Sequence, residues 1–372
     1  MTTTSAASTP TPAGESAQPS VRPSILDLIP GAILLIVLTL LVAEIDRAIA
    51  NAFRAQGVAQ NPLEYPLTAV VIGLIVNFIL RATNTFTRVR PAIRTEFFLK
   101  IGLVLLGARI SLGDLLATGA GGLIQALIMV TSVFFFTWWL GGKLKLSDTL
   151  RAVMSSAVSI CGVAAAIAAA GSVQARKEEV SYITTLVILT ALPLMVIMPP
   201  IAQALGLSPT VAGAWFGGNI DTTAAVVGAG TIYGPKAQEV AAIVKGTQNV
   251  LIGFAAFGLA LYFATVINRG KDEKRPSARV IWERFPKFVI GFVLVSILAS
   301  VGVFPKELTR EIDTASKWLF TLAFVCIGLE FSLKDLRQAG WRPVIVYLGA
   351  TVFNTLLALV VSYVIFGVVF PR

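Results

Sequence analysis

Long apolar runs separated by short polar connections follow one another from residue 25 to the C-terminus. Several of them reach the roughly 20 residues that a helix needs to cross a bilayer. The segments are 28–45, 66–80, 97–112, 119–140, 149–172, 180–204, 209–231, 238–267, 286–303, 316–333 and 343–370. The alternation typical of a membrane β-strand is not seen in them. Because a backbone in hydrocarbon must satisfy its own hydrogen bonds, the pattern predicts an all-α polytopic membrane protein with nine to eleven transmembrane helices.

Composition supports a membrane protein with one main domain. Of 372 residues, 56% are hydrophobic and 13% are charged, which is more apolar surface than one soluble core can bury. Residues 1–24, rich in Thr, Ser, Pro and Ala, are expected to form a disordered tail, and 28–45 is expected to be the first crossing rather than a signal peptide. Residues 25–372 then form a single transporter domain, with repeat-related halves of roughly 28–204 and 205–370.

The basic residues predict the orientation. The net charge is +10, and the most basic connections are 81–100 and 268–287. Such connections stay on the cytoplasmic side of a membrane. We therefore expect a multi-pass protein of the bacterial inner membrane with its N-terminus in the cytoplasm and its C-terminus outside. This topology accounts for the charge without a nucleic-acid partner.

An internal similarity predicts an inverted repeat. Residues 107–115 (GARISLGDL) match 328–336 (GLEFSLKDL), and the helices before them share a Val-Ile-Gly triplet at 71–73 and 289–291. An odd number of crossings separates the copies, so they run in opposite directions, as in secondary transporters. Arg109 and Glu330 occupy almost matched places, which suggests a structural ion pair across the pseudo-two-fold axis.

A second pair of similar stretches lies 60 positions apart: 159–171 (SICGVAAAIAAAG) and 219–231 (NIDTTAAVVGAGT). If the segments that contain them crossed fully, the two copies would be parallel. If both turn back inside the membrane, they enter from opposite faces and agree with the other repeat. We favour two broken or re-entrant glycine-rich helices, although two alanine-glycine runs can also align through composition alone.

Polar residues at these breaks are the candidate binding residues. An interrupted helix presents unpaired N–H groups that can seat an anion, and buried polar groups need a partner or a ligand. The candidates are Ser159, Cys161, Gly162, Gly218, Asn219, Asp221, Thr222 and Thr223, with Lys245 and Asn249 from the following segment. A single Ser or Thr can instead bond to its own helix, and Cys161 and Cys326 can be simple packing residues.

Lys245 has two interpretations of its own. Lys245, Gln248 and Asn249 fall on one helical face, which suits a polar lining. There the lysine could complement an anion or pair with Asp221, whereas near the membrane surface it would only extend its ammonium group to water.

Other classes of function lack their motifs. The chain contains no His, no Cys spacing typical of a metal site and no nucleotide-binding G-x-x-x-x-G-K-[ST] motif. We therefore expect no cofactor, no bound metal and no ATP-driven step. A membrane-embedded enzyme is the weaker alternative, because Ser-His and zinc chemistry are unavailable.

The SICGVAAAIAAAG run, the Glu179-Val-Ser-Tyr that follows it, the GGNIDTTAAVVGAG block and Val244-Lys245 resemble the YeiH-type membrane proteins, described as sulfate exporters. The resemblance spans roughly 28–370 and places the chain near the cation-proton antiporters and anion transporters. It implies alternating access around a mid-membrane site, with sulfate, sulfite or a sulfonate as substrate. A proton or sodium ion is a candidate coupling ion, a homodimer is a further expectation, and a cation/proton antiporter is the alternative function. Asp221-Thr222-Thr223 departs from the polar pattern of that family, which leaves substrate and coupling ion open.

Overall fold

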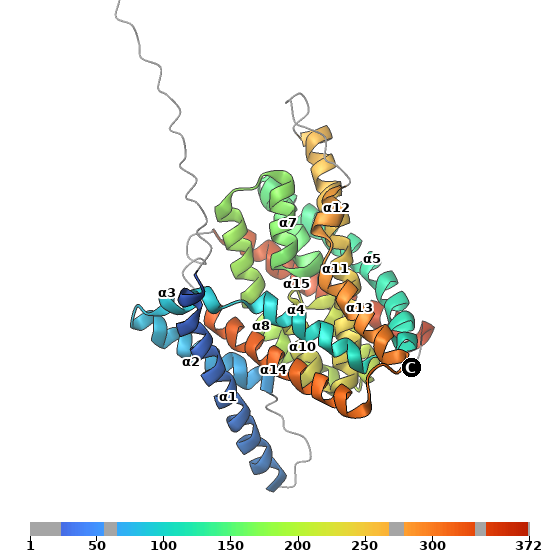
Figure 1. The fold of residues 1–372 in the computed structure, drawn as a ribbon. Coiled ribbons are helices and arrows are strands. Elements are labelled where there is room, and N and C mark those ends of the chain that lie inside the picture. The colour runs from blue at the N-terminus through green and yellow to red at the C-terminus, as the bar shows by residue number, and fades with distance from the viewer. Residues whose placement is uncertain (1–23, 56–64, 268–278, 332–339, 371–372) are drawn as a thin grey trace, which may run out of the picture.

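The computed structural model describes residues 24–55, 65–267, 279–331 and 340–370 (Figure 1). Within these ranges every regular element is a helix, which confirms the all-α prediction. The predicted tail lies, but for Ser24, outside the described residues. In chain order the elements are α1 (Ile25–Ala55), α2 (Tyr65–Ala82), α3 (Phe86–Val89), η1 (Arg90–Ala92), α4 (Thr95–Leu106), η2 (Gly107–Arg109), α5 (Leu112–Lys143), α6 (Asp148–Ser156), η3 (Ala157–Cys161), α7 (Val163–Val173), α8 (Lys177–Ala204), α9 (Pro209–Asn219), α10 (Thr223–Tyr233), α11 (Pro235–Tyr262), η4 (Phe263–Ile267), α12 (Arg279–Arg284), α13 (Lys287–Ser300), α14 (Lys306–Glu330), α15 (Trp341–Ser362) and η6 (Tyr363–Val369).

Seven of the described helices are long and apolar enough to cross a membrane: α1, α2, α5, α8, α11, α14 and α15, with η4 and η6 extending two of them. Two shorter segments lie along this set: α4 with η2 runs antiparallel to the candidate span α14, since Thr95 bonds to Glu330 and Arg109 to Asp313, and α13 is a shorter apolar helix. Leu112, which follows η2, donates its backbone N–H to Ser300 at the end of α13 over 2.7 Å, so both segments end at the same face. Together these nine segments fall within the predicted nine to eleven.

The first of the two similar stretches lies in a hairpin that turns back inside the molecule. Hairpin 1 consists of α6, the π-helical turn η3 and α7. Ser147, just before α6, and Thr149 donate hydrogen bonds of 2.9 and 3.1 Å to Glu179, which lies just after α7. Both ends of the hairpin therefore lie at one face. The turn is made at Gly162, whose φ of 61° and ψ of −113° disfavour any residue with a Cβ.

Hairpin 2, formed by α9 and α10, enters from the other face. Tyr233 at the end of α10 donates a hydrogen bond to the backbone carbonyl of Leu207, just before α9. Between the hairpins only α8 crosses, and its 28 residues span roughly 40 Å. Hairpin 1 ends where α8 begins, and hairpin 2 begins where α8 ends. The re-entrant form that we favoured from sequence is confirmed, and full crossings of both segments are excluded.

Close helix crossings repeat the predicted inverted symmetry. A Cβ added to Gly73 would lie 2.4 Å from the carbonyl oxygen of Val325 and 3.0 Å from Gly328. In the sequence match Gly73 corresponds to Gly291 and Gly328 to Gly107. A Cβ added to Gly107 would in turn lie 2.6 Å from the carbonyl oxygen of Phe292, the neighbour of Gly291. In both places the first helix of one repeat crosses the second helix of the other repeat: α2 crosses α14, and α13 crosses α4 with η2.

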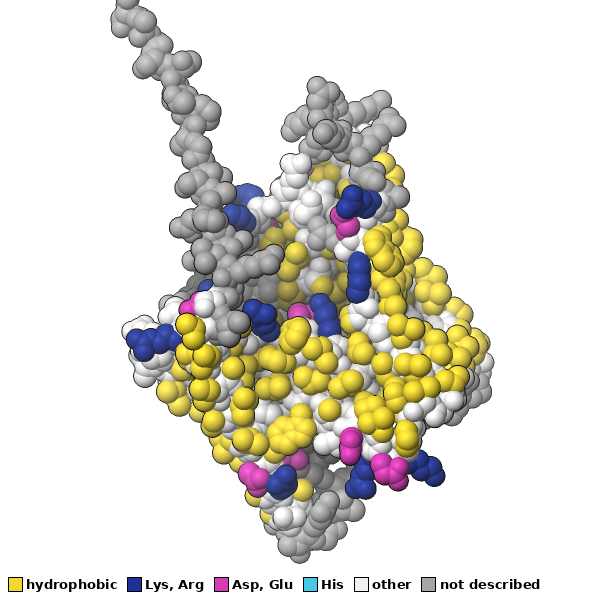
Figure 2. All heavy atoms as spheres, viewed as in Figure 1, with side chains coloured by type: hydrophobic (Ala, Val, Ile, Leu, Met, Phe, Trp, Pro, Cys, Tyr) yellow, Lys and Arg dark blue, Asp and Glu magenta, His cyan; other side chains and the backbone are white. Residues whose placement is uncertain are grey.

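The helices form two packed groups. In what we call the scaffold bundle, α14 packs on α2 and α4, with α1 and α13 beside them. In the hairpin bundle, both hairpins pack around α11 together with α5, α8 and α15. Figure 2 shows a broad band of hydrophobic side chains across the molecule, with Lys and Arg concentrated above it. Hairpin 1 enters from this side, which we call the basic face; Lys143, Lys145, Arg176 and Lys177 belong to it, and the other side is the opposite face.

Candidate functional site

The tips of the two hairpins meet in the interior and are joined by one amide. Asn354 of α15 is 2% exposed, and its Nδ2 donates to the carbonyl oxygens of Val158 at 3.3 Å and Asn219 at 2.9 Å. These carbonyls belong to the last turns of the incoming helices of hairpins 1 and 2. Because only the NH₂ group can donate to two carbonyls, this contact also fixes how the amide is oriented. Asn354 therefore holds the two tips at one place.

Asp221 lies in the extended link between α9 and α10. It is 1% exposed, and its Oδ2 accepts a hydrogen bond of 2.6 Å from the hydroxyl of Tyr347 on α15. Its Oδ1 is buried and has no hydrogen-bond partner among the described residues. A carboxylate oxygen in this position needs a proton, water or a ligand. Asp221 is thus a buried polar group at the helix break, as the sequence led us to expect, and one of its oxygens lacks a partner in the described structure.

Lys245 belongs to α11, and its side chain contacts the tip of hairpin 1. It is 1% exposed, so it does not extend to the membrane surface. Its Nζ donates to the carbonyl oxygen of Ile160 at 2.5 Å and to Oε1 of Gln248 at 2.8 Å. Gln248 in turn donates to the carbonyl of Ser159 over 2.9 Å. The predicted polar face of α11 therefore contacts hairpin 1, and within the described chain Lys245 forms no ion pair with Asp221.

Two helix N-termini begin at the tips. Thr222 caps α10, since its hydroxyl accepts from the backbone N–H of Ala225 at 3.2 Å. At the start of α7 the cap position is Gly162, which has no side chain to bond the free N–H groups. The Ser159 hydroxyl nearby is buried and lacks a partner in the described structure. Uncapped N–H groups and a helix dipole attract an anion, so this end of α7 is the better anion seat of the two.

A cavity of about 680 Å³ leads from the basic face to these tips. Its floor includes Val163, the first residue of α7, and Thr222, and one wall carries Ser181, Thr184 and Thr185 of α8. Arg94 and Glu330 of the scaffold bundle line it as well. The cavity therefore lies between the two bundles and reaches the helix break from one side.

The ten predicted residues are not equivalent in the structure. Ser159, Gly162, Asn219, Asp221, Thr222, Thr223, Lys245 and Asn249 come together at the tips, where Asn249 donates to Thr223 over 3.2 Å. Gly218 faces the other way, because a Cβ there would lie 2.1 Å from the amide nitrogen of Gln125 on α5. Cys161 packs in an apolar cluster with Ile252 and Ala256, and Cys326 is buried too. Gly218 and Cys161 thus make packing contacts, and Cys161 also lies beside Lys245 and the backbone N–H of Ala165 at the start of α7.

The predicted ion pair between Arg109 and Glu330 is wrong. Glu330 accepts a hydrogen bond of 2.9 Å from Thr95 at the basic face, whereas Arg109 lies at the opposite face with Asp313 and Glu239. Inverted repeats carry matched positions to opposite faces, so residues far from the axis cannot pair.

Sequence reasoning missed the contribution of α15. Tyr347, Thr351, Asn354 and Thr355 fall at i, i+4, i+7 and i+8, which is one helical face. Besides the contacts of Tyr347 and Asn354, Thr355 donates to Oδ1 of Asn219 at 3.0 Å. This stripe was visible in the sequence as a polar line in an apolar helix.

Comparison with known proteins identifies the family. Residues 31–347 match the family model described as conserved hypothetical protein 698. The chain is 42% identical to a UPF0324 membrane protein of Rhodopirellula baltica over 321 residues, or 83% of this chain and 59% of that protein. It is 30% identical to the UPF0324 membrane protein TauZ of Paracoccus denitrificans over 292 residues, 77% of this chain and 84% of that protein.

The chain belongs to this family, in agreement with the resemblance to YeiH-type proteins. It covers less than two thirds of the length of the first relatives, for example 55% of a UPF0324 membrane protein of Nitratidesulfovibrio vulgaris that is 38% identical over 82% of this chain. No solved structure is detectably similar.

Proposed function

We propose that this UPF0324 membrane protein is a secondary transporter that moves a small anion across the bacterial inner membrane by alternating access. Substrate would bind at the hairpin tips, and the hairpin bundle would move against the scaffold bundle to expose the site to each face in turn. No cofactor and no catalytic step are included in the proposal.

One observation carries it. The uncapped N-terminus of α7 lies at the floor of a cavity that opens to one face, next to a buried cluster containing Asp221 and Lys245. Free N–H groups, the Ser159 hydroxyl and the Lys245 ammonium would supply donors and positive charge to an oxyanion. Sulfate, sulfite or a sulfonate would fit these donors, and the family resemblance is what favours these sulfur oxyanions over other small anions.

A cation/proton antiporter is the second candidate. It is favoured by the unpartnered Oδ1 of Asp221, since an acceptor oxygen would suit a proton or a sodium ion better than an anion. In an anion transporter the same oxygen could carry a coupled proton.

Counterflow in proteoliposomes distinguishes the candidates. Vesicles would be loaded with sulfate, sulfite or a small carboxylate, and uptake of the labelled anion would be followed with and without an imposed pH gradient. We expect exchange of at least one anion, and dependence on the gradient would indicate proton coupling. Movement of sodium or potassium without any anion requirement would replace the proposal by the antiporter.

A further inference from the structure

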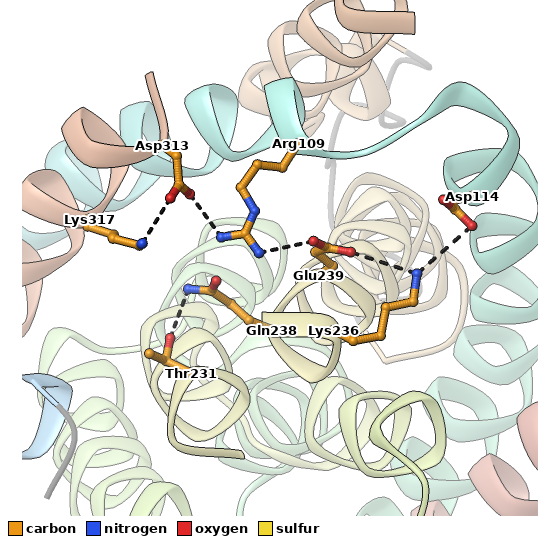
Figure 3. Close-up of polar contacts among 8 residues, drawn as sticks. All are labelled: Arg109, Asp114, Thr231, Lys236, Gln238, Glu239, Asp313 and Lys317. Carbon is orange, nitrogen blue, oxygen red and sulfur yellow. Dashed lines mark hydrogen bonds and ion pairs between the residues drawn. The ribbon is translucent and has the colours of Figure 1, made fainter. Parts of the chain in front are cut away.

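A chain of alternating charges lies at the opposite face, which we call the Arg109 cluster (Figure 3). Arg109 donates to Asp313 over 2.9 Å and to Glu239 over 3.0 Å. All three side chains are only 18–19% exposed. The cluster continues to Lys317 beyond Asp313, and beyond Glu239 to Lys236 and Asp114.

The cluster joins the two bundles. Asp313 and Lys317 belong to α14 of the scaffold bundle, and Arg109 lies in η2, which extends α4 and packs against α13. Glu239 lies near the start of α11, at the centre of the hairpin bundle. Gln238, its neighbour, donates to Thr231 of hairpin 2 over 2.8 Å. The contact between Arg109 and Glu239 therefore links the scaffold bundle to α11, the helix that is bonded to hairpin 2 through Gln238.

The cluster and the large cavity lie at opposite ends of the same boundary. On α14 the cavity-lining Ile327 follows Asp313 by fourteen residues, roughly 20 Å along a helix. On the neighbouring segment Arg109 follows the cavity-lining Thr95 by fourteen residues as well. The boundary between the bundles is thus open at the basic face and closed by ion pairs at the opposite face.

We infer that the contact between Arg109 and Glu239 is a gate that holds the opposite face closed while the basic face is open. Because it joins the two bundles, it must break when the hairpin bundle moves to expose the site to the other side. The inference rests on the alternating access proposed above, and it assigns to Arg109 a role in conformation and not in substrate binding.

Accessibility of single cysteines tests the gate without any substrate. Cys161 and Cys326 would be replaced by Ala, and one reporter cysteine added to this background. Ala242→Cys lies three residues after Glu239, is buried, and lines a small cavity of about 90 Å³ between α11, α4, α5 and α13. Thr185→Cys lies in the large cavity. A membrane-impermeant maleimide would be applied to each face in turn.

We expect Arg109→Gln and Glu239→Gln each to raise the labelling rate of Ala242→Cys from the opposite face by about tenfold, the typical coupling of a close charge pair. Labelling of Thr185→Cys from the basic face should fall. Lys317→Gln is the matched control, because Lys317 pairs with Asp313 on its own helix and should change neither rate.

Unchanged labelling in both Gln variants, or an equal rise in Lys317→Gln, would overturn the gate. If one Gln variant fails to elute as a single species, the other decides, since the two residues lie on different helices. If the labelling rates change as expected but no anion exchanges in the counterflow experiment, the gate is supported and only the proposed anion transport is refuted.

Discussion

At the scale of single residues, the site is unusual because two buried charges are each held by neutral partners. Asp221 and Lys245 are both 1% exposed, yet the carboxylate bonds to a tyrosine and the ammonium to a carbonyl and an amide. A buried charge without a counterion is costly, and proteins keep such groups at functional sites. Neither charge forms an ion pair within the described residues, as the proposed binding of a substrate or coupling ion at the tips requires.

Removing either charge should stop transport without unfolding the protein. Asp221→Ala and Lys245→Ala should each reduce counterflow to background, because the site loses the charge that compensates substrate or coupling ion. Both variants should still elute as single species from gel filtration in detergent. Lys143→Gln, which removes an exposed lysine at the basic face, is the control and should retain activity. Wild-type flux in both alanine variants would refute the assignment of the site.

Asn354 can be tested separately, because its proposed effect is on structure. Asn354→Leu would leave the carbonyls of Val158 and Asn219 without their donor, at a cost of about 1–2 kcal/mol in unfolding free energy. Thermal unfolding in detergent should show a lower midpoint. Thr265→Val, which removes an exposed hydroxyl bonded only within its own helix, should have no such effect. Equal midpoints for Asn354→Leu and wild type would mean that the tips are held by other contacts.

At the scale of elements, the hairpins show what sequence could and could not predict. Their re-entrance followed from two facts, the similarity of 159–171 to 219–231 and the parity of the crossings between them. The contacts of Asn354 and Tyr347 did not follow, because the polar stripe on α15 shows which face of that helix is polar but not which buried groups it meets. Arg109 was assigned a wrong partner because a sequence match gives equivalence, not proximity. Contacts between distant helices depend on packing, which no local pattern encodes.

Gly162 offers a test of hairpin 1. Gly162→Ala combines a positive φ with a clash, since the new Cβ would lie 2.5 Å from Cγ1 of Val187. We expect a loss of about 1–3 kcal/mol in stability, the usual cost of a strained backbone conformation. Gly119→Ala is the matched control: it lies inside α5 with nothing within 4 Å of a new Cβ, so a helical alanine should be neutral or stabilising there. Thermal unfolding of both variants in detergent measures the difference, and equal midpoints would show that the turn tolerates a side chain.

At the scale of the whole molecule, the cavity, the Arg109 cluster and the distribution of charge describe one conformation. The boundary between the bundles is open at the basic face and closed at the other. In the described part of the chain, the seven candidate spans together with α4–η2 and α13 make nine segments, an odd number that places residue 24 and residue 370 at opposite faces. Because the cavity opens at the basic face, the cavity faces whichever compartment the basic face lies in.

That orientation can be measured directly. Lysines and arginines remain on the cytoplasmic side during insertion, so the basic face should be cytoplasmic and the cavity should open inward. Lys143→Cys at the basic face and Lys306→Cys at the start of α14 are both exposed and provide one reporter for each side. With the natural cysteines replaced by Ala, an impermeant maleimide added to intact cells should label Lys306→Cys at once and Lys143→Cys only after permeabilisation. The reverse pattern would place the N-terminus outside, and the same conformation would then have to be described as open to the exterior.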